Sequence, residues 1–87
     1  MEAILPEVRR ALHDHIVGEV LLRRAPLGPD EDLFEAGFDS MSLARVLVFV
    51  EQRFGVTIPD EDVVVDEVST IERLSRFVAA RVAASRR

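Results

Sequence analysis

The sequence predicts an all-α fold: a bundle of three longer helices and one short helix, with a long loop between the first two helices. Apolar residues recur at helical spacing in three separate stretches, and residues that favour helix N-termini precede two of these stretches. One run of β-branched residues would suit a strand, but no partner strand is evident elsewhere. A chain of 87 residues is expected to form one domain, residues 1–87, around one core.

The first helix is predicted over about residues 2–22. Its apolar residues occupy every fourth position and so share one face of a helix: Ile4, Val8, Leu12, Ile16 and Val20. Pro6 suits only the first turn, where its missing amide proton leaves no carbonyl without a partner. Gly18 and the proline-containing tract of residues 25–29 mark the end of this helix and the start of a loop.

The loop between the first and second helices is acidic and long for so small a domain. Residues 30–39 contain five acids and no base. We expect the apolar side chains of Leu33, Phe34 and Phe38 to hold this loop against the core. A long loop that is ordered in this way is usually functional.

The second helix is predicted over residues 40–54. Asp39 or Ser40 suits its N-cap, because a short polar side chain accepts hydrogen bonds from the first free amides, and Gly55 suits its end. The inward stripe of this helix is apolar: Leu43, Val46, Leu47, Val50 and Phe54.

The short helix is predicted over residues 61–66. The three carboxylates of residues 60–62 favour a helix N-terminus, whose dipole attracts negative charge. We expect at least two of the valines at 63–65 to cover the core, although such a triplet would also suit a strand.

The last helix is predicted over residues 70–84. Ser69 followed three residues later by Glu72 has the pattern of a capping box, in which each side chain bonds to the backbone of the other. The buried face of the helix is again apolar: Ile71, Leu74, Phe77, Val78 and Val82.

The composition excludes several classes of function. The net charge of −5 disfavours nucleic acid, which requires a basic footprint, and the absence of cysteine excludes disulfides and thiolate metal sites. The longest apolar run, residues 46–50, is far shorter than the roughly 20 residues that span a bilayer. We therefore expect a cytoplasmic protein that binds neither nucleic acid nor membrane. We also expect a monomer, because no long unmatched apolar face is apparent.

The side chains that could perform catalysis do not form a set. His13 and His15 lie two apart on the first helix and point to different faces, so they cannot share a metal ion, and we expect both to be solvated. Ser40 lacks the surrounding of a hydrolase nucleophile, because position 42 is serine where that motif needs glycine. No metal site and no enzymatic activity are predicted.

Residues 32–41, Asp-Leu-Phe-Glu-Ala-Gly-Phe-Asp-Ser-Met, give Ser40 a distinctive context. This run resembles the phosphopantetheine attachment sequence of acyl carrier proteins, where an acidic-apolar-Phe segment leads through glycine to Asp-Ser-Leu or Asp-Ser-Met. Residues 50–60 resemble the end of that family's second helix, and residues 69–71 resemble the start of its fourth. The resemblance covers about residues 30–80 and implies the four-helix acyl-carrier-type bundle.

The resemblance implies roles for particular residues. Ser40 would carry 4′-phosphopantetheine from coenzyme A as a covalent cofactor. Asp39 would help a phosphopantetheinyl transferase to recognise Ser40, or would orient the arm. Partner recognition would extend over the outer face of the second helix and the segment after it: Met41, Ala44, Arg45, Asp62 and Val63. The family commonly docks through acids on that face, and Arg45 departs from this pattern. The departure suggests dedicated partner enzymes.

The implied function is that of a free-standing, non-catalytic acyl carrier protein that shuttles acyl or aminoacyl thioesters between enzymes. Polyketide or hybrid polyketide/nonribosomal peptide biosynthesis is the expected setting, with an acyltransferase, adenylating ligase or ketosynthase as partner. A peptidyl or aminoacyl carrier of a nonribosomal peptide pathway and a fatty-acid-type carrier are the alternatives. A helical docking module in which Ser40 stays unmodified is the alternative of another class.

Overall fold

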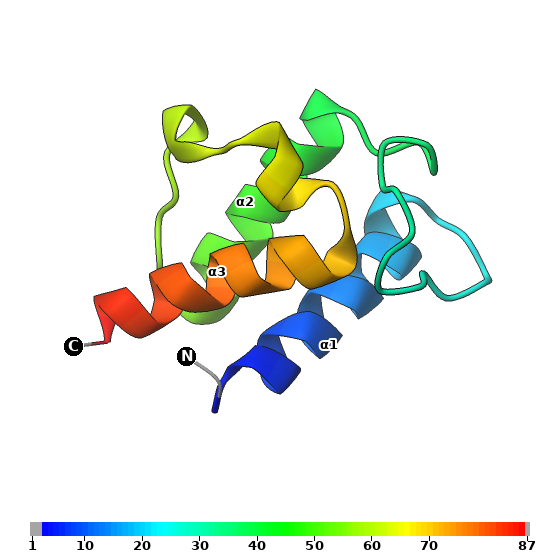
Figure 1. Cartoon of the computed structure of the whole chain (residues 1–87). Coiled ribbons are helices and arrows are strands. Elements are labelled where there is room, and N and C mark those ends of the chain that lie inside the picture. Colours follow the sequence, from blue (N-terminus) through cyan, green and yellow to red (C-terminus); the bar gives the residue numbers. More distant parts are fainter. Residues whose placement is uncertain (1–2, 87) are drawn as a thin grey trace.

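The computed structural model describes residues 3–86, which form an all-helical bundle (Figure 1). Three α-helices, α1 (Leu5–His15), α2 (Ser40–Phe54) and α3 (Ile71–Ser85), are joined by shorter helical segments, and residues 3–86 contain no β-strand. The predicted fold class is confirmed. Within the same residues, no helix combines the length and the apolar character needed to cross a membrane.

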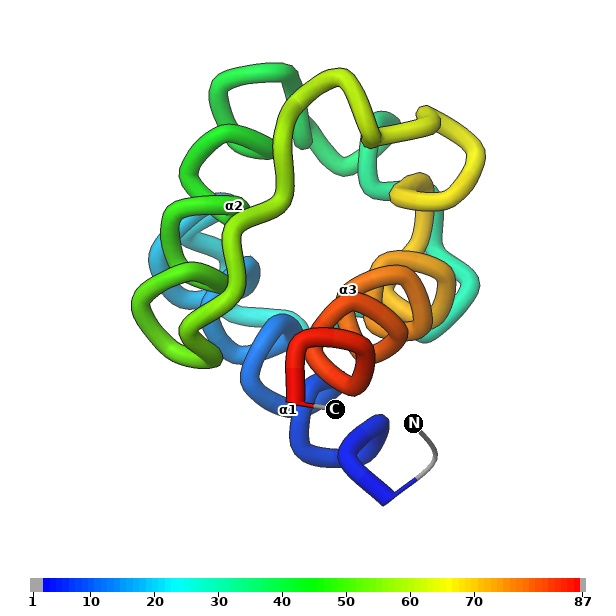
Figure 2. Tube along the Cα trace, turned by 90° about the vertical axis from the view of Figure 1, so that its left-hand side faces the viewer, coloured from blue at the N-terminus to red at the C-terminus, as the bar shows by residue number. Residues whose placement is uncertain are grey.

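The helices surround one apolar cluster. Viewed end on (Figure 2), α2 and α3 lie on either side, α1 lies below them, and the connection from α2 to α3 closes the top. The fully buried side chains come from all three helices and from the loops: among them are Leu12, Leu33, Phe38, Val50, Val68 and Val78. The loops therefore form part of the core, as expected for a chain too short to bury enough surface with helices alone.

The first helix begins and ends inside its predicted bounds. Pro6 lies in the first turn of α1, as predicted, and α1 continues directly into a π-helical segment, η1 (Ile16–Val20). There the amide of Leu21 donates to the carbonyl of Ile16, five residues earlier, at 2.7 Å. Leu22 then turns to a left-handed φ of 53°, which ends the helix before the proline-containing tract.

The acidic loop is held by two of its three predicted anchors. Leu33 and Phe38 are buried, but Phe34 is 38% exposed and only packs edge-on against Phe38, with ring centroids 5.9 Å apart. The amide of Leu33 donates to the carbonyl of Ser69 at 2.8 Å, so the loop is also fixed to the segment that precedes α3. The expectation that Phe34 anchors the loop was wrong, because its ring packs on Phe38 and is not part of the core cluster.

The segment predicted as one short helix over residues 61–66 consists of two 3-10 turns, η2 (Asp60–Asp62) and η3 (Val65–Val68). Val63 and Val64 between them are extended, the backbone that β-branched residues prefer. The valine prediction was also wrong: Val64 and Val65 are 52% and 64% exposed, and Val63 is the one member of the triplet that packs against the core.

The start of α3 differs from the predicted capping box by one residue. Thr70 is the N-cap, and its Oγ1 accepts a hydrogen bond from the Arg73 amide at 3.1 Å. Glu72 instead accepts from Arg9 of α1 at 2.9 Å and from Arg76 at 3.0 Å. Glu72 therefore forms a long-range ion pair with Arg9 instead of the capping hydrogen bond that the local sequence pattern predicted.

Candidate functional site

Ser40 is the exposed first residue of α2, and Asp39 before it is the N-cap. Asp39 Oδ1 accepts hydrogen bonds from the Ser42 amide and from Ser42 Oγ, both at 2.9 Å. These two bonds lower the pKa of the Asp39 carboxyl below its ordinary value, so the group is ionised at neutral pH. Because Asp39 performs the capping, the Ser40 hydroxyl is not needed for it.

The backbone before Ser40 is positioned by Gly37 and Phe38. Gly37 has a φ of +103°, a conformation that side chains with a Cβ rarely adopt, and this turn directs the chain from the loop into α2. The Phe38 amide donates to the Leu33 carbonyl at 2.9 Å, and its ring is buried. The buried ring therefore fixes the start of α2 while the next two residues point outward.

The surroundings of Ser40 fit an attached phosphate. The first amides of α2 lack helical partners, and the positive end of the helix dipole stabilises negative charge placed there. A shallow hollow of about 190 Å³ beside Ser40 is lined by Leu43, Ala44 and Asp60. Because Ser40 is exposed, a phosphodiester on its hydroxyl would lie at the protein surface.

The outer face of α2 carries three further residues predicted to recognise partners. Met41 is 69% exposed, and Ala44 and Arg45 lie beside it on the same face. Val48, one turn further along, is 55% exposed, so α2 is apolar on its outer as well as its inner side. The structure thus brings Met41, Ala44 and Arg45 together with Ser40 on one helix face.

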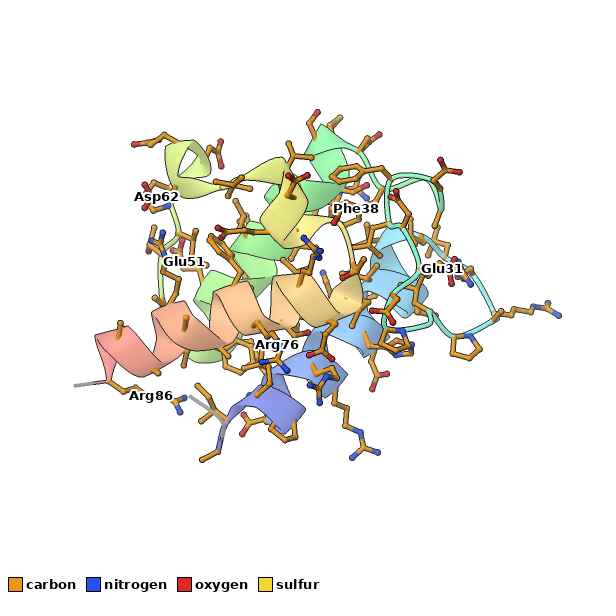
Figure 3. The ribbon with its side chains drawn as sticks, in the orientation of Figure 1. Glu31, Phe38, Glu51, Asp62, Arg76 and Arg86 are labelled. Carbon is orange, nitrogen blue, oxygen red and sulfur yellow. The ribbon has the colours of Figure 1, made fainter. Side chains whose placement is uncertain are left out.

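Asp62 and Val63 are held by other parts of the structure. Asp62, labelled in Figure 3, accepts a hydrogen bond from Arg81 of α3 at 2.9 Å. Val63 is half-buried against the core. Asp60, which was not singled out from the sequence, is the residue of this segment that lines the hollow with Ser40.

Besides Val48, residues 3–86 include four exposed large apolar side chains that were not among the predicted site residues: Leu22, Phe34, Val64 and Val65. Phe34 and the valines had been expected to cover the core, and helical periodicity gives no information about such loop positions. The sequence does not indicate the left-handed backbone at Leu22, because residues other than glycine seldom adopt this conformation.

The two histidines are structural rather than solvated, which corrects the prediction for both. His13 Nε2 accepts a hydrogen bond from the Leu27 amide at 3.0 Å and so holds the first loop. The His15 ring stacks on Phe49 of α2 with centroids 4.0 Å apart, and its Nδ1 lies 3.0 Å from Glu19 Oε2. Each imidazole contacts a different segment, so the two do not form one site.

Comparison with known families gives a match that covers most of the chain. The family described as "Phosphopantetheine attachment site" matches residues 14–78, which is more than half of the chain and includes Ser40 and all of α2. Carrier domains of this family are non-catalytic and interact with a phosphopantetheinyl transferase and with biosynthetic enzymes. The chain therefore belongs to the phosphopantetheine attachment family, the carrier proteins that bear 4′-phosphopantetheine covalently and tether biosynthetic intermediates on it.

Proposed function

We propose that Ser40 is the residue that bears 4′-phosphopantetheine, and that the chain carries acyl or aminoacyl thioesters in a natural-product pathway of the polyketide type. The observation that carries the assignment is the exposed Ser40 hydroxyl at the N-terminus of α2, directly after a cap supplied by a different residue. The bound group supplies the terminal thiol that holds the cargo.

The chain's own residues supply attachment and presentation. Ser40 Oγ would give up its proton and form a bond to the pantetheine-side phosphorus of coenzyme A, while the pyrophosphate bond of coenzyme A breaks and adenosine 3′,5′-bisphosphate leaves. The N-terminal end of α2 favours the negative charge of the resulting phosphodiester. The Asp39–Ser42 hydrogen bonds keep the helix start ordered, so the hydroxyl has a fixed position when a transferase approaches. Ionised Asp39 is also an exposed charge next to Ser40 that a transferase can recognise.

Met41, Ala44 and Arg45 are proposed to contact partner enzymes, and their position on the same helix face as Ser40 supports this. Asp62 and Val63 are proposed as outlying contributors. Asp62 would have to give up its ion pair with Arg81, and Val63 contributes only its exposed edge. The face nearest Ser40 therefore supplies most of the recognition in this proposal.

The pathway assignment is based on the charge of α2. Near Ser40 its outer face presents Arg45 among apolar side chains, and the one acid of α2 is Glu51 near the end of the helix. Most of the other acids of this chain lie in the loop before α2 and in the segment after it. Partners that recognise an acidic helix would meet the wrong charge here. This favours dedicated loading and condensing enzymes of a specialised pathway over the enzymes of fatty-acid synthesis.

The attachment proposal is tested by intact mass after incubation with coenzyme A, magnesium and a promiscuous phosphopantetheinyl transferase. Wild type is expected to gain one phosphopantetheine, and Ser40→Ala none. Ser42→Ala is the matched control, since it removes the other hydroxyl of this turn and is expected to be modified like wild type. No mass gain on wild type would favour the unmodified docking module instead.

The pathway proposal needs a second assay, with the holo chain as substrate. An acyltransferase that delivers a polyketide extender group is expected to load it, whereas an adenylating amino-acid ligase would load an aminoacyl carrier. Efficient loading by fatty-acid enzymes alone would contradict the polyketide assignment while leaving attachment at Ser40 intact.

A further inference from the structure

The connection from η1 to α2 begins as a loop that is closed on itself. Arg23 Nη1 donates a hydrogen bond to Glu31 Oε2 at 2.8 Å, and the same guanidinium donates to the carbonyls of Ala25 and Pro26. The side chain of Arg23 is only 28% exposed. The loop therefore keeps its own shape through contacts that do not involve the helices.

Two hydrogen bonds join residues 25–29 to the helices within the described residues 3–86. The Glu72 amide of α3 donates to the Pro29 carbonyl at 3.1 Å, and the Leu27 amide donates to Nε2 of His13 in α1 at 3.0 Å. The Leu27 side chain is 5% exposed and belongs to the apolar core. The bond to His13 therefore holds the part of the loop that contributes to the core.

This bond determines the protonation state of His13. A backbone N–H can only donate, so Nε2 must present its lone pair and cannot carry a proton. Nδ1 lies 3.1 Å from the acceptor Asp14 Oδ1, which places the one proton of the ring on Nδ1. The imidazole that holds the Leu27 amide is therefore neutral.

Charged side chains of α1 surround His13 with both signs. Arg9 and Arg10 line the same hollow of about 420 Å³ as His13, and they disfavour a further positive charge on the ring. Asp14 favours such a charge, but it meets the ring at Nδ1, which already has its proton. A second proton could therefore enter only at Nε2, the atom that accepts from Leu27.

The elements that face His13 from across the hollow do not offset this conflict. Residues 25–29 contain no charged side chain. In α3, the Glu72 carboxylate is already bonded to Arg9 at 2.9 Å. A proton on Nε2 would thus leave the Leu27 amide without its acceptor and place two donors against each other.

We propose that His13 is a pH-sensitive latch on this loop: its neutral ring holds residues 25–29 against α1, and a proton on Nε2 releases them. Histidine is the side chain whose ordinary titration lies between about pH 5 and 8. The released ring can bind a proton at Nε2 and the latched ring cannot, so acid favours the released form. One pH unit below histidine's ordinary midpoint of about 6.5, release is favoured about tenfold more than at neutral pH.

The turn before Ser40 has attachments of its own and is expected to stay in place. The Leu33 amide donates to the Ser69 carbonyl at 2.8 Å, and the Phe38 ring is buried. Release of residues 25–29 would therefore expose Leu27 and alter one end of the bundle without disordering the attachment residue. The latch thus offers a way to change a surface of the protein by pH while modification of Ser40 continues.

The test is an NMR titration of the whole chain between about pH 7.5 and 5.5. Hydrogen-exchange protection factors, which correct each rate for the intrinsic effect of pH, are measured for the Leu27 and Ser42 amides. The Leu27 factor should fall about tenfold, in step with the ring signals of His13. The Ser42 factor should stay within twofold, because its acceptor Asp39 has a pKa lowered below its ordinary value of 3.8 and remains ionised.

Two matched variants separate the two histidines. His13→Gln keeps an acceptor for the Leu27 amide but cannot be protonated, so the pH response of Leu27 should disappear. His15→Gln removes the other imidazole and should leave that response within twofold of wild type.

Four results would overturn the proposal. They are a proton on His13 Nε2 at pH 7.5, seen in the ring nitrogen shifts, a constant Leu27 factor, equal losses at Leu27 and Ser42, and a response that persists in His13→Gln. The wild-type titration decides by itself if the glutamine variant does not fold.

Discussion

Asp39 Oδ1 lies 2.9 Å from the Ser42 amide nitrogen and also 2.9 Å from Ser42 Oγ, so one carboxylate oxygen closes the first turn of α2 around Ser40. This relationship separates two tasks that a serine at a helix start could combine. Asp39 stabilises the helix, and Ser40 remains available for modification. The separation makes the contribution of each residue measurable.

Asp39→Ala should lower the denaturant concentration at which the protein unfolds, because the Ser42 amide loses its acceptor. Asp39→Asn is the matched control: it keeps a capping oxygen and removes only the charge. If the transferase recognises the charge, the Asp39→Asn variant should retain near-normal stability but accept phosphopantetheine more slowly. Equal stability of Asp39→Ala and wild type would show that the cap contributes nothing.

The ion pairs of Glu72 should make stability depend on pH. Hydrogen bonds from Arg9 above all, and from Arg76, lower the pKa of the Glu72 carboxyl below its ordinary value of 4.5. A lowered folded-state pKa stabilises the fold above about pH 4.5 and loses that contribution as pH falls through the folded value. Glu72→Gln should cost about 1 kcal/mol or less at pH 7, because the carboxyl is partly solvated.

The difference between Glu72→Gln and wild type should begin to shrink as pH falls below about 4.5 and should vanish once the folded-state carboxyl is protonated, because both side chains are then neutral. Urea unfolding at pH 7, 5 and 3 measures it. A difference that stays constant down to pH 3 would exclude the ion pairs as its cause.

The two phenylalanines of the acidic loop should differ sharply in their contribution to stability. Phe38 is 2% exposed and Phe34 is 38% exposed. Phe38→Leu should cost about 1–3 kcal/mol through lost packing, whereas Phe34→Leu should stay within about 0.5 kcal/mol. Chemical denaturation of the pair checks this, and equal losses would contradict the division between a buried anchor and an exposed ring.

Gly37 and Gly18 should respond to alanine in opposite directions. Gly37→Ala would force a φ of +103° on a residue with a Cβ, at a cost of about 1–3 kcal/mol. Gly18→Ala adds a Cβ that meets no atom within 4 Å, and it should stabilise the helical backbone of η1 by about 0.5–1 kcal/mol. Thermal unfolding of the two variants beside wild type measures both, and a stabilising Gly37→Ala would contradict the turn described before Ser40.

The sequence predicted the elements whose determinants are local. Three predicted features depend only on nearby residues, and the structure has each of them. They are the buried stripe from Val8 to Ile16, the N-cap of α2 at residue 39 or 40, and the end of α2 at Gly55. The cap at Ser69 was wrong by one residue because Thr70 caps equally well and Glu72 bonds instead to Arg9, which is distant in the chain.

The remaining differences also come from contacts between distant residues. His15, the last residue of α1, contacts Phe49 only when α1 and α2 pack together, and no local pattern distinguishes this histidine from a solvated one. The valines at 63–65 show a different limit of sequence-based prediction. Their preference for extended backbone can be seen in the sequence, but the sequence does not show which of them contacts the core.

Attachment at Ser40 is tested most directly by locating the modification within the chain. Cleavage after Arg24 and Arg45 releases the peptide of residues 25–45, in which Ser40 and Ser42 are the only hydroxyl side chains. After treatment with transferase and coenzyme A, fragment ions should place one phosphopantetheine on Ser40 and leave Ser42 unmodified. A modified Ser42, or a peptide that gains no mass, would contradict the assignment of Ser40 as the carrier residue.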